Sequence, residues 1–304
     1  MIPESARVSG AGLESPQRPA RRRVAVVIPT LHDRAAIAEE SVRAQTFKDV
    51  EVKVIVGVRP AARARNIGVA ETSADFIVFV DDDARLGHDR VLERLVEVAE
   101  SGPDVGIVGP SKILSPRASS LQRRIAREVP RWQFPVVERD VEANPPTDRH
   151  GSTGITTTCC LVPRRVFEEM DGFDEQLTTG EDPEFFFRVR QAGYRFVIPG
   201  RTWVYHDPPD AILPFLKRMF SYGRGHALEA RKAPDRQMDL VRLRTWYGKL
   251  FVLLSPLLFL PSLFLSVYLE PRPHLEVGLR PFKALSTYST LYGYAWGWFR
   301  ASRR

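Results

Sequence analysis

Short apolar runs alternate with segments of helical spacing over the first third of the chain. The runs are continuously apolar, which is typical of strands covered on both faces. Such alternation predicts an α/β layer with a mostly parallel sheet. The predicted strands are Val24–Pro29, Val50–Gly57, Asp75–Val80 and Val105–Val108, and the predicted helices are Arg34–Gln45, Ala61–Ala70 and Asp89–Glu100.

Three adjacent carboxylates, Asp81, Asp82 and Asp83, directly follow the third apolar run. Side by side they repel one another, so a folded chain keeps them together only if something offsets the charge. A solvated turn is one interpretation. The other is a divalent cation, because Mg²⁺ and Mn²⁺ prefer oxygen ligands. Ligands bind at the carboxyl ends of parallel strands, and this position favours the cation.

The segment Ser111–His150 has few periodic signals and is predicted to be a connecting region. The strand predicted after it contains the only two cysteines of the chain, Cys159 and Cys160. Neighbouring residues of a strand point to opposite faces, so we expect no disulfide between them. Two cysteines also exclude a zinc site built on cysteines alone.

A second acidic pair, Glu181 and Asp182, precedes the predicted helix Glu184–Gln191. Pro183 suits the first helical position, which predicts Asp182 as the N-cap. Capping needs no catalysis, but a helix needs only one of two adjacent acids as its cap. His206 ends another short predicted strand and, taken alone, is as consistent with a structural role as with a ligand.

The net charge of +7 is concentrated at the two ends of the chain. Residues 24–210 are mildly acidic, with 24 basic and 30 acidic side chains, whereas residues 211–304 have fifteen basic and five acidic ones. Nucleic-acid binders interleave basic groups with a reading surface. A basic segment beside an apolar run fits an anionic membrane surface better, so we expect a membrane partner and no nucleic acid.

The apolar run Leu250–Leu269 has no charged residue and is long enough to cross a membrane as a helix. Pro256 and Pro261 count against a regular helix, and a buried core helix is the alternative. The aromatic-rich stretch Phe282–Phe299 is predicted to lie on the bilayer or to re-enter it. The predicted divisions are a disordered tail (1–22), a catalytic domain (23–210), a basic amphipathic helical connector (211–248) and a membrane-associated helical hairpin (249–304).

Three sequence stretches, in this order and spacing, resemble the family 2 glycosyltransferases of the GT-A fold, in their membrane-associated form. They are "VAVVIPTLHDR", "ARARNIGVAETSADFIVFVDDDA" and "CCLVPRRVFEEMDGFDE…GEDPEFFFRVRQAGYR". The resemblance implies inverting transfer of a sugar from a nucleotide-diphosphate sugar to an acceptor hydroxyl on a glycan or a lipid-linked carrier. The Lys and Arg residues on both outer flanks of the apolar C-terminal region predict a place at the cell membrane, with the catalytic domain on the cytoplasmic side.

The same resemblance assigns roles to the acidic residues. Asp81 and Asp83 fall on the family's Asp-x-Asp motif, which holds Mg²⁺ or Mn²⁺ at the donor diphosphate, and His206 falls on a further metal or phosphate contact. Asp182 falls on the general base, and Glu181 beside it would position the acceptor.

The resemblance further implies a set of nucleotide-sugar contacts. They are Pro29, Thr30, Arg65, Asn66, Asp81 and Asp82. Many family members have an acidic turn after the second strand, whereas this chain has Val56-Gly57-Val58-Arg59 there. Asp33 is the alternative contact for the nucleotide base.

Two other classes of function are compatible with parts of the pattern. A non-catalytic sugar- or lipid-binding module would keep the fold and lose the chemistry. A nucleotidyltransferase would need a glycine-rich loop after the first strand, and the stretch "PTLHDRAAI" has no glycine. Convergence of Asp81, Asp83 and Asp182 on one centre would favour the enzyme over the binding module.

Overall fold

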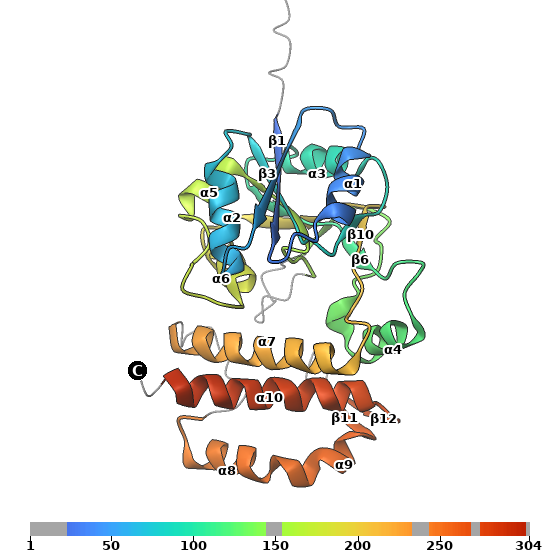
Figure 1. Ribbon diagram of the computed structural model, residues 1–304, viewed down its shortest axis with the longest axis vertical. Helices are drawn as coiled ribbons and strands as arrows, with labels where there is room; N and C mark the ends of the chain where they lie inside the picture. The colour runs from blue at the N-terminus through green and yellow to red at the C-terminus, as the bar shows by residue number, and fades with distance from the viewer. Residues whose placement is uncertain (1–22, 144–153, 233–242, 269–273, 302–304) are drawn as a thin grey trace, which may run out of the picture.

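The structure is a computed structural model that describes residues 23–143, 154–232, 243–268 and 274–301. An α/β part is followed by a stack of helices below one edge of the sheet (Figure 1). The strands are β1 (Val24–Thr30), β2 (Val50–Val56), β3 (Phe76–Val80), β4 (Arg85–Leu86), β5 (Val105–Val108), β6 (Ser111–Ile113), β7 (Val141–Glu142), β8 (Cys159–Pro163), β9 (Arg195–Ile198), β10 (Trp203–Tyr205), β11 (Leu265–Tyr268) and β12 (His274–Val277). The helices are α1 (Ala36–Arg43), α2 (Ala61–Ala70), α3 (Val91–Ala99), α4 (Ser120–Glu128), η1 (Pro130–Trp132), α5 (Arg164–Glu169), α6 (Glu181–Gln191), α7 (Ile212–Lys232), α8 (Trp246–Leu254), η3 (Ser255–Leu258), α9 (Phe259–Ser262) and α10 (Pro281–Ala301).

The main sheet has the strand order β2-β1-β3-β8-β5-β9-β7 among the described residues. β1 pairs in parallel with β2 and β3, and β5 pairs in parallel with β9, whereas β8 and β7 are antiparallel to their neighbours. All residues of β3 and β8 are buried, because helices cover both faces of the sheet. The prediction of an α/β fold with a mainly parallel sheet is confirmed.

A second, three-stranded sheet brings His206 to the carboxylate turn. β10 pairs antiparallel with β4 and parallel with β6. β4 follows the Asp81–Asp83 turn directly, so its pairing with β10 places the end of β10 beside that turn. The backbone N–H of His206 continues the ladder by donating to the carbonyl of Ile113 at 3.0 Å.

The segment Ser111–His150 contains more structure than predicted, because β6, α4, η1 and β7 lie in its described part. A local signal marks α4. Ser119 accepts from the N–H of Gln122, and the Gln122 side chain accepts from the N–H of Ser119, which forms a capping box. The spacing of these two residues is visible in the sequence and would have predicted the helix.

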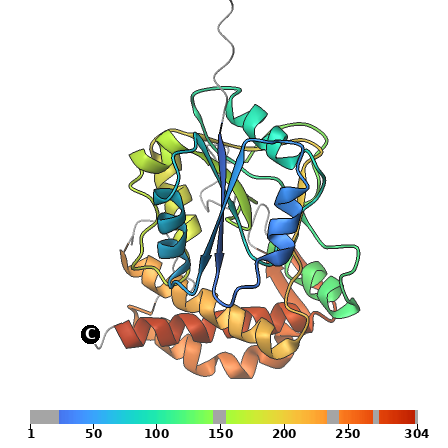
Figure 2. The same cartoon turned by 45° about the horizontal axis from the view of Figure 1, so that its top comes forward.

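The C-terminal helices form layers, with α7 against α10 and α8 and α9 beyond α10 (Figures 1 and 2). The backbones of α7 and α10 approach closely at Gly223, where a Cβ would lie 2.0 Å from the carbonyl oxygen of Thr290. The buried carboxylate of Glu128, at the end of α4, accepts from the N–H of Phe282 at 2.7 Å and satisfies the start of α10. These contacts attach the C-terminal layer to the α/β part.

The prediction of a membrane-spanning helix at Leu250–Leu269 is wrong. The run is divided among α8, η3, α9 and β11, with Pro256 and Pro261 in the interrupted part, where proline removes a helical hydrogen bond. Among the described residues, no helix combines the length and apolar character that a membrane crossing requires. The aromatic stretch Phe282–Phe299 forms most of α10, and the tail 1–22 lies outside the described residues.

Candidate active site

The structure brings Asp81, Asp83 and His206 together. One ligand atom from each lies within 4.8 Å of the others. His206 is buried, its Nε2 lies 3.3 Å from Oδ1 of Asp83, and its buried Nδ1 makes no hydrogen bond with a described residue. Two carboxylates and an imidazole suit a divalent ion such as Mn²⁺. The residues predicted as metal ligands therefore fit that role.

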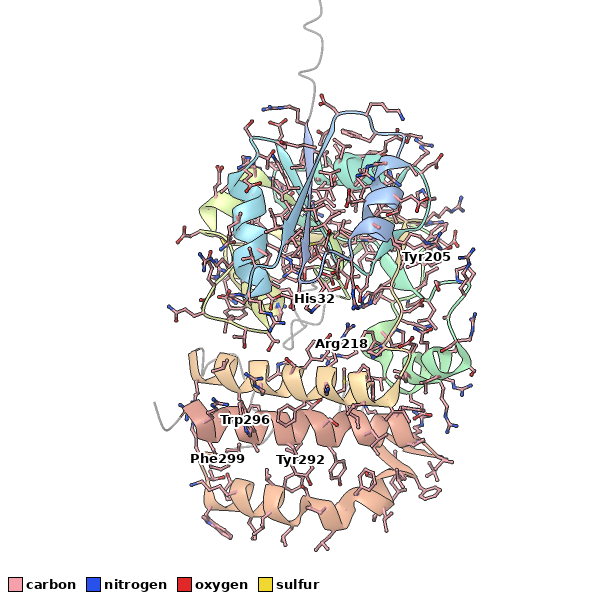
Figure 3. The ribbon with its side chains drawn as sticks, viewed as in Figure 1. His32, Tyr205, Arg218, Tyr292, Trp296 and Phe299 are labelled. Atoms are coloured by element: carbon pink, nitrogen blue, oxygen red, sulfur yellow. The ribbon has the colours of Figure 1, made fainter. Side chains whose placement is uncertain are left out.

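Asp83, whose side chain is 47% exposed, is held in its charged form by its contacts with His206 and Arg218. Burial opposes the charge, but the hydrogen bond with His206 and the guanidinium of Arg218 lower the pKa of Asp83 to about 2. Arg218 belongs to α7, and its Nη2 lies 3.6 Å from Oδ2 of Asp83. Figure 3 shows Arg218 on the side of α7 that faces the α/β part. The C-terminal layer thus contributes a residue to this site.

Asp82 lies on the side of the turn that faces the end of β1. Thr30, which is buried, donates its hydroxyl to Oδ2 of Asp82 at 2.6 Å, and accepts from the N–H of Arg34 at 3.0 Å. Burial raises the pKa of Asp82 against the effect of the Thr30 hydrogen bond. Pro29 precedes Thr30 in β1. The contacts of Pro29, Thr30 and Asp82 with a nucleotide-sugar stay predictions, and the structure places all three at the same strand ends.

Arg65 connects the metal-ligand group to the start of α6. Its guanidinium is 4% exposed and donates to Oδ1 of Asp81 at 3.0 Å and to Oε1 of Glu181 at 2.7 Å. The guanidinium also lies 5.7 Å from the centre of the Phe173 ring. Burial opposes its charge, but Asp81 and Glu181 raise the pKa of Arg65. A permanently charged group therefore lies between the two acidic motifs that the sequence singled out.

The Asn66 side chain makes hydrogen bonds to the loop before α6. Its Oδ1 accepts from the N–H of Phe173 at 3.0 Å, and its Nδ2 donates to the carbonyl of Phe173 at 2.9 Å and to Glu175 at 3.0 Å. These three hydrogen bonds hold the loop whose Phe173 ring supports Arg65. The structure thus gives Asn66 a positioning role, and its contact with a nucleotide stays a prediction.

Asp182 lies in the first turn of α6 and does not cap it. The helix begins at Glu181, and its N-cap is Gly180, with φ of 85°. Pro183 is consequently the third helical residue, where a missing N–H still costs no helical hydrogen bond. Burial, and then the charge of Glu181, raise the pKa of Asp182 to about 7 against the opposing effect of Arg65. The expected N-cap is thus wrong, while the position of Asp182 beside the metal-ligand group holds.

Helix α7 is attached directly to the loop before α6. A Cβ on Gly225 would lie 2.0 Å from Oγ1 of Thr179, and this hydroxyl donates to the carbonyl of Ser221 at 3.1 Å. The close approach requires glycine at position 225. It explains the second glycine of the stretch Tyr222-Gly223-Arg224-Gly225 and fixes α7 next to the acidic start of α6.

Sequence reasoning missed several residues that line this site. Trp132 of η1 stacks on His206 with 5.7 Å between ring centres, and Arg218 lies 5.6 Å from the Trp132 ring. Lys112 of β6 is buried and within the electrostatic influence of Asp81, Asp182 and Asp83. Trp132 and Lys112 come from the segment predicted to be a connecting region, where no spacing pattern marked them.

A sequence model described as "Glycosyltransferase like family 2" matches residues 12–221. The chain belongs to this family. Among curated relatives, it is 27% identical over 198 residues to the pre-mycofactocin glycosyltransferase of Mycobacterium tuberculosis (64% of this chain, 40% of the relative). It is 29% identical over 178 residues to the succinoglycan biosynthesis protein ExoM of Rhizobium meliloti (56% of this chain, 53% of the relative). The matches thus span about half or less of these relatives.

A solved structure shares the fold of this family 2 chain. It is the mannosyltransferase PcManGT from Pyrobaculum calidifontis in complex with GDP-Man and Mn²⁺. The TM-score is 0.56, the sequence identity is 14%, and the alignment covers 92% of this chain and 88% of that one. At this identity the likeness establishes the fold. The family 2 assignment and the GT-A fold agree with the sequence expectation.

Proposed function

We propose that the protein is an inverting, metal-dependent glycosyltransferase that uses a nucleotide-diphosphate sugar. The observation that carries the proposal is the convergence of both acidic motifs on one centre, through Arg65 bonded to Asp81 and Glu181. Such convergence favours an enzyme over a binding module, because catalytic partners must reach one reacting atom. The relatives named as glycosyltransferases and the neighbour bound to GDP-Man and Mn²⁺ support the same class.

The chemistry follows from the charges. Asp182 accepts the proton of the acceptor hydroxyl while that oxygen forms a bond to the anomeric carbon and the bond to the diphosphate breaks on the opposite side. Mg²⁺ or Mn²⁺, held by Asp81, Asp83 and His206, would supply positive charge beside the leaving diphosphate. Arg65 keeps Glu181 and Asp81 in place. A pKa of about 7 makes Asp182 a base matched to neutral pH.

The role of Asp182 is tested by exchanging each acid of α6 for its amide. We expect Asp182→Asn to lower kcat by about 10²–10⁴-fold, the usual contribution of a general base. Glu181→Gln should lower it less. Glu184→Gln is the matched control, because Glu184 is on the same turn but pairs with Arg188. If Asp182→Asn turns over near the wild-type rate and Glu181→Gln is inactive, Glu181 is the base and Asp182 positions the acceptor. A product with retained anomeric configuration would reject the inverting mechanism.

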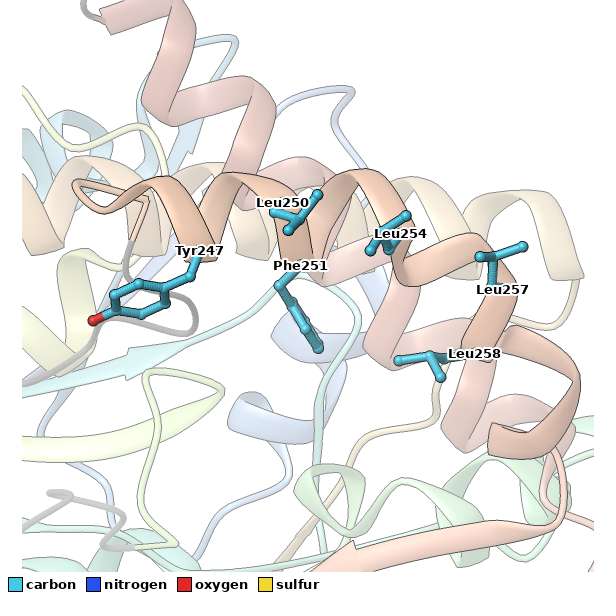
Figure 4. A pocket seen from close by; sticks show the side chains of 6 residues that line it. All are labelled: Tyr247, Leu250, Phe251, Leu254, Leu257 and Leu258. Atoms are coloured by element: carbon cyan, nitrogen blue, oxygen red, sulfur yellow. The ribbon is translucent and has the colours of Figure 1, made fainter.

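We also propose that the protein works at an anionic membrane surface on a lipid-linked or polysaccharide acceptor, with its catalytic domain on the cytoplasmic side. The support is an exposed apolar face on α8, η3 and α9. Leu253, Leu257 and Leu260 are each at least 69% exposed, and Trp246 is 75% exposed. Figure 4 shows an apolar groove along this face. It is lined by Tyr247, Leu250, Phe251, Leu254, Leu257 and Leu258.

The charge around this face favours a lipid surface over a second protein copy. Residues 241–269 contain no acidic residue, and Arg244 and Lys249 flank the exposed leucines. Helices that lie in the plane of a membrane combine an apolar face, interfacial aromatic rings and basic flanks. In-plane docking therefore replaces the spanning hairpin that the sequence predicted.

Vesicle flotation tests the docking. We expect binding to vesicles with anionic lipid, and a loss of at least about tenfold in Leu253→Glu/Leu257→Glu, because each leucine contributes about 1.5–3 kcal/mol on burial. Both side chains are exposed, so the fold should tolerate the change. Ile37→Glu is the control, since Ile37 is 58% exposed on α1. Unchanged flotation of the double variant would reject the docking, and concentration-dependent dimers would assign this face to a second copy.

A further inference from the structure

Lys112 of β6 is a largely buried lysine that pairs with no described residue. Its side chain is 7% exposed, and its ammonium makes no hydrogen bond or ion pair with any residue in the described part of the chain. Removing an ammonium group from water costs several kcal/mol unless an opposite charge compensates it. A lysine kept in this state within an active site points to a ligand that supplies the compensation.

The backbone holds Lys112 on the same face as His206. Both its N–H and its carbonyl are bonded to Phe134, at 3.1 and 2.7 Å. In the register of β6 and β10, Lys112 is opposite Val204, two residues before His206. Alternate residues of a strand point to the same face, so Lys112 and His206 leave the small sheet together.

The Lys112 ammonium lies within electrostatic reach of both the metal-ligand group and the proposed base. Burial lowers the pKa of Lys112, whereas Asp81, Asp182 and Asp83 act in the opposite direction and Arg131 in the same one. Arg131 of η1 lies 4.6 Å from the ring centre of Tyr222 on α7. With Arg218 next to Asp83, three cations reach this region from β6, η1 and α7.

We propose that Lys112, together with Arg131 and Arg218, binds a phosphate group of a substrate on the α7 side of the metal-ligand group. The inference rests on the proposed function. A divalent ion would offset the charges of Asp81 and Asp83, which would leave these three cations in need of an anion. A phosphate fits, because its oxygens accept several charge-assisted hydrogen bonds at once and a lysine ammonium contacts them as a compact charge. The phosphate belongs either to the donor diphosphate or to a phosphorylated acceptor.

The experiment is a titration of the full chain with Mn²⁺ followed by four probes, UDP, GDP, inorganic pyrophosphate and a short isoprenyl monophosphate. We expect Lys112→Met to weaken binding of at least one probe by about 10–100-fold, as for a lost hydrogen bond to a charged group. Lys112→Arg should retain part of the affinity. The Kd for Mn²⁺ alone should not change. Lys53→Met is the control, because Lys53 pairs with Glu51 on β2, the edge strand of the main sheet.

The pattern of loss identifies the source of the phosphate. Weaker binding of the diphosphates assigns Lys112 to the donor, and weaker binding of the isoprenyl monophosphate assigns it to the acceptor. If Lys112→Met binds every probe that the wild type binds with the same Kd, this inference is wrong while the proposed function stands. If the wild-type chain with Mn²⁺ binds none of the probes, both are rejected.

Discussion

The turn after β3 and the start of α6 carry the same functional group in opposite electrostatic settings. Loss of contact with water opposes the charged form of both Asp83, whose side chain is 47% exposed, and Asp182, which is half-buried. The pKa of Asp83 is nevertheless lowered to about 2, because His206 and Arg218 face it. The pKa of Asp182 is raised to about 7, because burial is reinforced by its neighbour Glu181 and Arg65 offsets this only in part.

This difference separates two roles within one site. A carboxylate that remains charged at every physiological pH is suited to holding a cation. A carboxylate with a pKa near 7 is suited to taking up and releasing a proton. The two terminal nitrogens of Arg65 are bonded to Asp81 and Glu181, so Arg65 acts on Asp182 only through its charge. The division of roles therefore follows from where the cations lie.

The largest expected effect concerns the metal. Asp83→Ala should remove activity and weaken Mn²⁺ binding by on the order of 100-fold, because it removes a direct ligand of the ion. Asp182→Asn should bind Mn²⁺ as the wild type does. Mn²⁺ titration followed by electron paramagnetic resonance measures both. Full turnover in excess EDTA would reject the metal role of Asp83. An equal loss of Mn²⁺ affinity in both variants would show that the two carboxylates do not differ in metal binding.

A smaller effect concerns the pH dependence of catalysis. Because only the ionised base accepts a proton, kcat/KM should rise with pH through about 7, the pKa of Asp182. The charges that act on it are Glu181, Arg65 and Asp81, and Lys112 and Tyr222 also lie within electrostatic reach. Arg65→Met removes a cation that lowers this pKa. The rising part of the plot of kcat/KM against pH should therefore move to higher pH by about one unit, which corresponds to about 1.4 kcal/mol in the free energy of ionising Asp182.

The test of this shift is a pH–rate profile for the wild type and Arg65→Met at saturating Mn²⁺. Arg63→Met is the control, because Arg63 is an exposed residue on the same helix. If the rise of kcat/KM with pH has the same midpoint in Arg65→Met as in the wild type, a group other than Asp182 sets the pH dependence.

Much of the α/β part was predictable, because its strands are buried on both faces and leave continuous apolar runs such as Val24–Pro29. Helix Ala61–Ala70 and strand Val105–Val108 have their predicted bounds. The C-terminal run was predicted wrongly because length and hydropathy do not show where proline interrupts a helix. Pro256 and Pro261 lie in the part where the helix is interrupted, and both are visible in the sequence.

The candidate site was predictable where its residues lie at strand ends, as for Asp81, Asp83 and His206. It was not predictable where tertiary pairing supplies the residue. Lys112 reaches the site only because β6 pairs with β10, and no local pattern reports that pairing. The catalytic role of Asp182 stays a prediction, and its predicted capping role is wrong, since Gly180 with its positive φ is the N-cap of the helix.

The smallest expected effect is on stability and again separates the two carboxylates. The pKa of Asp182 is about 7 in the folded chain and 3.8 for an unperturbed aspartate. The folded state therefore binds more protons than the unfolded state between these values, so the free energy of unfolding falls as pH rises from about 4 to about 7. Asparagine cannot ionise and avoids this loss. Asp182→Asn should thus raise Tm by a few degrees at pH 8 and leave it unchanged near pH 4.

Asp83→Asn should show the opposite sign, because its folded-state pKa is lowered to about 2 and its charge is stabilising at neutral pH. Thermal unfolding of both variants at pH 4 and pH 8, in EDTA so that no bound ion contributes, measures the difference. Glu184→Gln controls for loss of a charge from the first turn of α6. If Asp182→Asn lowers Tm equally at both pH values, the buried carboxylate is stabilised by contacts other than those that set its pKa, and its contrast with Asp83 is structural rather than electrostatic.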